Sequence, residues 1–431
     1  MKNFRKNQGI TLIALVITVI VLLILAGVTI ATLTGDNGIL TRAQEAKDKT
    51  EISAEDELRK LTILEAETHL EDYEYTDKSG KTITIPAKCA VSQVQGENTF
   101  ENGLVIIDAN GNEWVWIEVP KTVNVYMTAG LKVTSFTDEE YRKIYNDLVN
   151  YAVIYRDEDN LGVGVGEDEW YDGSGNDASK SANLDDTTGC GLTSEEYTQL
   201  RKNMLKSIYK NEGFFVGRYE VGIKEDTYRN YDEEYTQIHP INETPVIQAN
   251  KYVYNWVKTS QAQELSQKLS IGGKTSSLIF GIQWDLILKY IETKNIIFGA
   301  SNQTTQYKLK IDSSSCGNYS NAEFDVTNVN AKYSATFGKD YLKVSMQGYS
   351  KPSEKILLTT GATVRNSIAG IFDLAGNVDE WTLEKTPVND YPCNIRGGAF
   401  GSAGSSATIS NRYRYKTYYN YYATGFRATL Y

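Results

Sequence analysis

The chain has 431 residues, a length that predicts two or three folded units rather than one ordinary domain. Hydrophobic residues at 41% and charged residues at 23% are close to globular averages, which excludes wholesale disorder and a polytopic membrane protein. The net charge of −11 disfavours binding to phosphates, so we expect no nucleic-acid partner. With two histidines, His69 and His239, the sequence has little material for a multi-histidine metal centre or a Ser-His-Asp triad.

The first 33 residues combine a basic leader with an uncharged apolar segment. Three basic residues precede Gly9, whereas residues 10–33 carry no charge and are long enough to cross about 30 Å of hydrocarbon. The positive-inside rule places the basic leader on the cytoplasmic side. The sequence therefore predicts a leader at 1–9 and a transmembrane helix at 10–33, with the membrane as a partner.

The junction between these two segments reads Gly9-Ile10-Thr11-Leu12-Ile13 and resembles the cleavage site of type IV prepilins. The resemblance implies Gly9 and Ile10 as processing residues, because the prepilin peptidase cuts after such a glycine and methylates the new N-terminus. It also implies prepilin peptidase and other pilin subunits as partners, and a bacterial cell-envelope protein whose C-terminal domain is extracellular.

One residue of this segment departs from the prepilin pattern. The fifth mature residue, normally Glu in the family, is Ala14, which favours a tip or low-copy subunit over the bulk filament. An uncleaved N-terminal anchor is the alternative that the residues leave open.

A second helical pattern follows the glycines Gly35 and Gly38, which disfavour continuing the first helix. Apolar residues recur at three- and four-residue intervals from Ile39 to Leu64, with Glu and Lys between them. This pattern predicts a stalk helix within residues 34–70, or a coiled-coil spacer. We expect a connector at 71–100 and then a larger domain at 101–431.

The larger domain has the signals of an α+β fold. A hairpin is predicted over residues 104–117, around Asn110-Gly111, because this dipeptide suits a tight turn between strands. Capping boxes at Thr137/Glu140 and Ser260/Gln263 each predict a helix start. Residues 157–191 are rich in Asp, Gly, Ser and Asn and predict a long solvated loop, with a calcium site as the alternative.

Four motifs of this domain resemble the formylglycine-generating enzyme (sulfatase-modifying factor) family, which has a C-type-lectin-like fold. They are GFFVGRYEV at 213–221, GIFDLAGNVDEWT at 370–382, IRGGAF at 395–400 and GFR at 425–427. We interpret Trp381 and Phe426 as core residues of that fold, because large aromatic side chains more often pack than contact a ligand.

The family resemblance also implies a structural calcium ion. The corresponding positions are Asp373 and Glu380 through their carboxylates, and Gly376 and Val378 through their carbonyls, all of them hard oxygen ligands. The residues alone equally allow an ordinary Asx-turn with an exposed Glu380 and no cofactor.

The catalytic residues of that family are missing. Its enzymes bind copper through two cysteines that follow the Arg-Gly-Gly motif, and alignment on Gly397-Gly398 places Ser402 and Ala407 there. Neither side chain can ligate copper, so we expect no enzyme, and a formylglycine-generating-type oxidase is the disfavoured alternative. The cysteines at 89, 190, 316 and 393 leave open disulfides in three connectivities, or free thiols.

The positive signal for function is the segment 399–424, AFGSAGSSATISNRYRYKTYYNYYAT. Tyr among Ser, Gly and Asn is typical of paratopes, where rigid amphipathic rings give contact area at a low entropy cost. The expected ligand-binding residues are Tyr413, Tyr415, Tyr418, Tyr419, Asn420, Tyr421, Tyr422, Ser402, Ser405 and Asn411.

Within this segment we expect residues 418–422 to dominate binding. Tyr413 and Tyr415 alternate with Arg412 and Arg414, so on a strand the tyrosines share one face and are the likelier pair to turn inward.

The segment also resembles the variable proteins of diversity-generating retroelements, a branch of the same fold. Together, the sequence predicts a surface-displayed, pilin-anchored protein that recognises an external protein or glycan, with retroelement diversification as a further implication. A structural minor pseudopilin is the other alternative, since it would retain the N-terminal segment without using the tyrosines.

Overall fold

The computed structural model describes residues 19–23, 39–156, 166–172, 189–231, 238–326, 328–345 and 348–431. The chain divides into two units between Lys60 and Leu61. The leader 1–9, the processing residues Gly9 and Ile10, and most of the segment 10–33 lie outside the described residues, as does most of the loop 157–191. Within the described part, none of the helices has the length and apolar character that a membrane span needs.

The predicted stalk region forms one long helix, α2 (Ile39–Thr68), which confirms a helix within residues 34–70. The remaining helices are α3 (Asp138–Tyr151), α4 (Ser194–Asn211), α5 (Thr259–Gln267), α6 (Gly281–Thr293) and α7 (Thr305–Lys310), with 3-10 turns η1 (Val153–Tyr155) and η3 (Val364–Asn366).

Side chains cap the helix starts, one as predicted and one differently. The Thr137/Glu140 capping box at α3 is confirmed, since each of these residues accepts a hydrogen bond from the backbone of the other. The predicted box at Ser260/Gln263 is wrong: α5 begins at Thr259, and Gln261 accepts from the amide of Lys258 at 3.2 Å. Gln263 instead accepts from the amide of Leu278 at 2.9 Å, because it faces the neighbouring strand.

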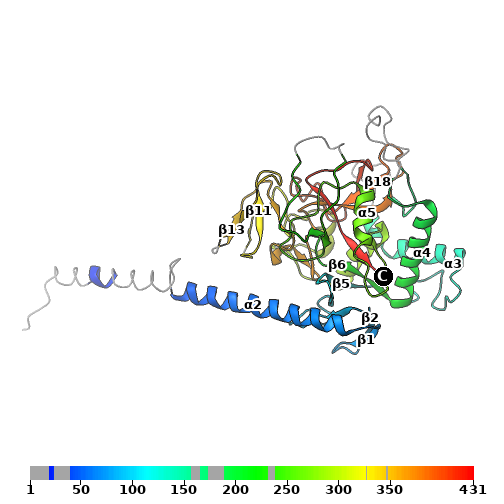
Figure 1. Ribbon diagram of the computed structural model, residues 1–431, viewed down its shortest axis with the longest axis horizontal. Helices are drawn as coiled ribbons and strands as arrows, with labels where there is room; N and C mark the ends of the chain where they lie inside the picture. The colour runs from blue at the N-terminus through cyan, green and yellow to red at the C-terminus, as the bar shows by residue number, and fades with distance from the viewer. Residues whose placement is uncertain are drawn as a thin grey trace, which may run out of the picture. The chain divides into compact units, whose positions relative to one another are not determined.

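Two sheets organise the second unit, and together with the helices they confirm an α+β fold. The larger sheet has the order β3 (Cys89–Val91), β4 (Val105–Asp108), β5 (Glu113–Glu118), β6 (Gly213–Gly217), β21 (Ala428–Leu430), β9 (Ser276–Leu278). The second has the order β19 (Tyr413–Tyr415), β18 (Cys393–Arg396), β17 (Asp379–Lys385), β20 (Thr424–Phe426). The chain ends beside β6, where Figure 1 marks the C-terminus.

Short strand pairs complete the fold. They are β1 (Tyr73–Thr76) with β2 (Thr82–Ile85); β7 (Gly222–Ile223) with β8 (Pro245–Val246); β10 (Phe324–Val326) with β13 (Tyr349–Lys351); β11 (Lys332–Ser334) with β12 (Leu342–Lys343) and β14 (Leu357–Leu358); and β15 (Ser367–Ile368) with β16 (Ile371–Phe372).

The N-terminal limit of the large domain differs from the prediction. The hairpin of β4 and β5 around Asn110-Gly111 is confirmed. However, β3 pairs with β4 before residue 101, and the second unit begins at Leu61. The segment 71–100 is therefore part of the folded unit rather than a connector, because its apolar residues, such as Ile85, are buried in the core.

Trp381 and Phe426 are fully buried, which confirms both as core residues. The Trp381 ring nitrogen donates to the Val257 carbonyl at 2.9 Å, and that of Trp284 donates to the Ile409 carbonyl at 3.0 Å, so both polar atoms are satisfied inside the core. All four cysteines are buried and none of them forms a disulfide.

Candidate functional site

The Tyr-rich segment supplies the edge strand of the four-stranded sheet. Strand β19 pairs antiparallel with β18, with Tyr413 opposite Ile395 and Tyr415 opposite Cys393. Tyr413 is 43% exposed, whereas the preceding Arg412 is 2% exposed. The expectation that the tyrosines of this strand turn inward is therefore wrong for Tyr413, and it is Arg412 that enters the core.

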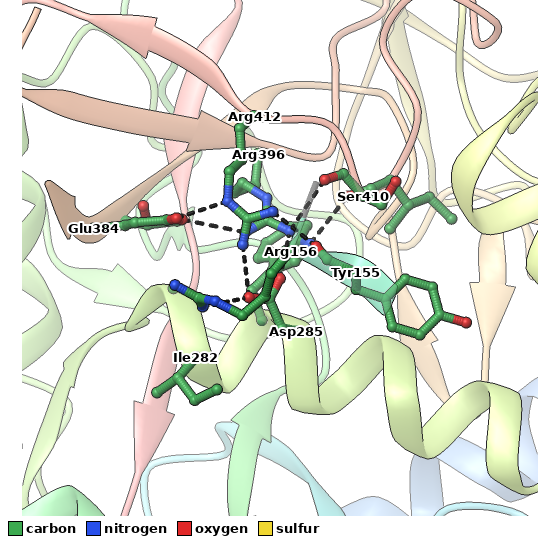
Figure 2. A network of polar contacts seen from close by, with 12 residues as sticks. Tyr155, Arg156, Ile282, Asp285, Glu384, Arg396, Ser410 and Arg412 are labelled. Carbon is green, nitrogen blue, oxygen red and sulfur yellow. Dashed lines mark hydrogen bonds and ion pairs between the residues drawn. The ribbon is translucent and has the colours of Figure 1, made fainter. Parts of the chain in front are cut away.

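The physical reason is a buried ion-pair network, which we name the arginine cluster: Arg156, Arg396 and Arg412 with Asp285 and Glu384. Figure 2 shows Arg412 between the two carboxylates, with Nη2 2.6 Å from Asp285 and Nε 2.6 Å from Glu384. Arg156 and Arg396 also contact Asp285, at 2.7 and 2.9 Å. The cluster satisfies a buried guanidinium that would otherwise be costly.

Backbone carbonyls accept further hydrogen bonds from these arginines. Arg412 donates to the carbonyl of Tyr155 at 2.7 Å, and Arg396 donates to that of Ser410 at 3.2 Å. Because Glu384 lies on β17 and Asp285 on α6, the cluster joins the sheet, this helix and the start of β19. It fixes the backbone from which Tyr413 projects.

The pKa values of Glu384 and of the neighbouring Asp168 are shifted in opposite directions. Burial acts to raise the pKa of Glu384, but Arg412, Arg396 and Arg156 together hold that pKa below its ordinary value. Burial raises the pKa of the neighbouring Asp168 to about 6, although Arg156 opposes the shift. Asp168 accepts from the amides of Gly281 and Ile282 at 2.8 and 3.0 Å, and so caps the N-terminus of α6.

Two hollows adjoin the exposed ring of Tyr413 and the half-buried ring of Tyr415, which also packs against Trp381. The Tyr391 hollow, of about 240 Å³, is lined by Tyr391, Tyr413, Arg414, Tyr415, Lys416 and Tyr419. The Asp379 hollow, of about 420 Å³, is lined by Lys355, Asp379, Ala399, Gly401, Ser402, Ser406, Ala407, Asn411, Tyr413, Tyr415, Tyr421, Tyr422 and Ala423. Tyr413 and Tyr415 line both hollows and form a ridge between them.

The structure brings most of the predicted binding residues to this surface. Tyr419 lines the Tyr391 hollow. Six others line the Asp379 hollow: Ser402, Asn411, Tyr413, Tyr415, Tyr421 and Tyr422. Ser405 is exposed but lines neither hollow.

Tyr418 and Asn420 are each 1% exposed, so these two residues support the binding surface from beneath and are not part of it. The expected dominance of residues 418–422 is corrected accordingly, because Tyr418 packs beneath the surface, stacked against Tyr419 with ring centroids 5.7 Å apart.

Asp379 and Tyr391 lie in the hollows and were missed by sequence reasoning. The family motif drew attention to Glu380, whereas the preceding Asp379 begins β17 and lines the hollow. Burial, and secondarily the charge of Glu380, raises the pKa of Asp379 to about 7. The alternation of side chains along β17 could have distinguished Asp379 from Glu380, because adjacent side chains of a strand point to opposite faces.

The predicted calcium ligands do not fit a calcium site. Arg427 donates to both carboxylate oxygens of Glu380, at distances of 2.6 to 3.1 Å, and so occupies the place of the cation. Asp373 accepts from the amide of Gly361 at 2.6 Å, and its other oxygen has no hydrogen-bond partner in the described part of the chain. The described residues also contain no group of three or more acidic, His or Cys side chains placed to hold a metal. The ordinary turn is favoured, except that Glu380 is buried rather than exposed.

We therefore expect the melting temperature to be equal in calcium buffer and after chelation. A ligand that binds only the native state would add RT ln(1 + [L]/Kd) to its stability, so a bound ion would be visible in this measurement. The check is thermal unfolding of the full chain with millimolar calcium or with a chelator, and an upward shift in calcium would restore the calcium site.

Comparisons with known proteins add little to this geometry. No model of a known protein family matches the chain, and no curated protein matches it. Among solved structures, the chain is similar to Treponema denticola variable protein 1, with 12% identity and a TM-score of 0.22 over 83% of this chain and 98% of that one. A likeness this low carries no argument about fold or function.

Proposed function

We propose that this chain is a ligand-binding protein, whose C-type-lectin-like head recognises an external protein or glycan through the surface around Tyr413 and Tyr415. The observation that carries the proposal is the exposed Tyr413 ring on a strand whose neighbouring residue, Arg412, is anchored in the arginine cluster. An aromatic side chain held on a fixed backbone loses little entropy on binding, which is the advantage of a preorganised paratope.

The lining of the Asp379 hollow supports recognition rather than oxidation. Ser402 and Ala407, which stand where the family resemblance expects copper-binding cysteines, both line this hollow. A hydroxyl and a methyl group cannot hold soft copper, so the hollow offers surface for a ligand and no site for that chemistry.

Display at the cell surface is the second part of the proposal and depends on the N-terminal segment. The resemblance of residues 9–13 to a prepilin cleavage site supports anchoring in the bacterial envelope, with prepilin peptidase and pilin subunits as partners. The resemblance of the segment 399–424 to retroelement variable proteins supports diversification of the binding surface. A minor pseudopilin remains the alternative that makes no use of the tyrosines.

The binding surface is tested by replacing its two ridge tyrosines. A glycan array and an array of extracellular proteins are probed with wild type and with Tyr413→Ala/Tyr415→Ala. We expect affinity for any bound probe to fall at least thirtyfold, because one aromatic hot spot carries about 2 kcal/mol. Tyr307→Ala is the matched control, since Tyr307 on α7 is 37% exposed and lines neither hollow.

Two outcomes would contradict the recognition surface. One is a probe that binds the double variant as tightly as wild type. The other is an equal loss of affinity in Tyr307→Ala, which would show that the effect is not specific to the ridge.

The anchor is tested separately by the mature N-terminus. Mass spectrometry of protein from cells with active prepilin peptidase is expected to find a chain that begins at Ile10, with a methylated amine. Gly9→Leu should block this cleavage. Recovery of wild type with an intact Met1 from such cells would contradict pilin-type processing and favour the uncleaved anchor.

A further inference from the structure

Strand β17 carries three carboxylates, and only two of them have a cation partner among the described residues. Glu380 pairs with Arg427, and Glu384 pairs with Arg396 and Arg412. The backbone amide of Asp379 donates to the Ala423 carbonyl at 2.8 Å. Its carboxylate forms no hydrogen bond or ion pair in the described part of the chain. Asp379 also lines the hollow that is named after it.

Four tyrosines line the same hollow as Asp379. They are Tyr413, Tyr415, Tyr421 and Tyr422, and the hydroxyl of Tyr421 donates to that of Tyr422. Aromatic ring faces are negative, so they attract a cation and disfavour an anion. A carboxylate among such rings is a site with a strong preference for positive charge.

The other charged and titratable groups near Asp379 do not neutralise it. Glu380 adjoins it on the strand and adds negative charge, and the buried Tyr319 lies close enough to interact with it electrostatically. Lys355 lines the hollow as well, but its side chain is exposed and no ion pair joins it to Asp379. The positive charge that complements this carboxylate is thus left to the ligand.

We infer that the Asp379 hollow binds a lysine or arginine side chain of a protein ligand. The inference rests on the proposed recognition function and chooses protein over glycan, because a neutral glycan brings no charge to the carboxylate. The volume of about 420 Å³ lies within the range of small-ligand pockets and accommodates one long side chain. Aromatic walls hold the aliphatic stem while Asp379 binds the charged end.

The inference is tested with a displayed library of random twelve-residue peptides. Peptides are selected on the wild-type chain, and those that lose binding to Tyr413→Ala are retained and synthesised. We expect each retained peptide to contain a Lys or Arg whose replacement by Gln weakens binding at least thirtyfold. Asp379→Asn should weaken the unmodified peptide by a similar factor, and the two changes combined should weaken binding little further.

A folding control and one further variant keep the test decisive. Asp379→Asn preserves the side-chain shape, and its thermal unfolding is compared with wild type to confirm folding. Lys355→Glu changes only an exposed residue, and it should tighten the same peptides by up to about fivefold.

The outcomes distinguish a failure of this inference from a failure of the proposed recognition function. Retained peptides that bind Asp379→Asn as tightly as wild type would overturn the inference and leave the recognition function standing. Weakened binding in Lys355→Glu would also overturn it. A library that yields no peptide dependent on Tyr413 would contradict the recognition of a protein ligand through this surface, and the inference with it.

Discussion

Asp285→Ala is expected to lower the free energy of unfolding by about 3–5 kcal/mol, because it leaves buried arginines without their shared partner. Asp285 is completely buried on α6 and contacts Arg156, Arg396 and Arg412. After the replacement Glu384 is the only other carboxylate that forms ion pairs with these arginines in the described part of the chain. Arg396 and Arg412 would then share Glu384, and Arg156 would lose the ion pair that it forms with Asp285.

Urea unfolding of the full chain measures this effect, with Glu139→Ala as the matched control. Glu139 forms an exposed pair with Lys143 on α3, and such surface pairs contribute about 0.2–1 kcal/mol. Asp285→Asn, which keeps the shape of the side chain and removes its charge, separates electrostatics from packing. A loss below about 1 kcal/mol in Asp285→Ala would mean that the cluster does not hold the sheet to the helix.

This cluster also shows where prediction from the sequence ended. The alternation Arg412-Tyr413-Arg414-Tyr415 predicts a strand correctly, but it is symmetric and does not say which face is buried. The answer depends on Asp285 and Glu384, which are distant in sequence and meet Arg412 only in the folded chain. Inward tyrosines are the usual outcome by hydrophobicity, and here paired buried carboxylates outweigh it.

Predictions from residues close in sequence were more reliable than predictions that depend on contacts between distant elements. The Thr137/Glu140 capping box and the Asn110-Gly111 turn were predicted because each involves residues a few positions apart. The burial of Trp381 and Phe426 followed from their size. The Ser260/Gln263 box failed since the same residue types also hydrogen-bond across elements, as Gln263 does with Leu278.

Composition led to the candidate site, but it did not separate the exposed residues of this segment from the buried ones. The excess of tyrosines in residues 399–424 indicated a surface, and most of the expected residues do line the two hollows. Composition cannot distinguish an exposed ring from a supporting one, so Tyr418 was assigned to the surface. Asp379 was missed because a single acidic residue carries no signal until its surroundings are known.

Tyr418→Ala is therefore expected to cost about 3 kcal/mol of stability, in the range for deletion of a buried aromatic ring. Tyr413→Ala should stay within about 0.5 kcal/mol, as exposed positions usually do. Urea unfolding of both variants measures the contrast, and equal or reversed losses would contradict the division into surface and support. Tyr418 is 1% exposed and Tyr413 is 43% exposed, so packing restricts the side chain at position 418 and not that at position 413. If the segment is diversified, variation should then concentrate at Tyr413 and spare Tyr418, because few residue types fit a closed packing position.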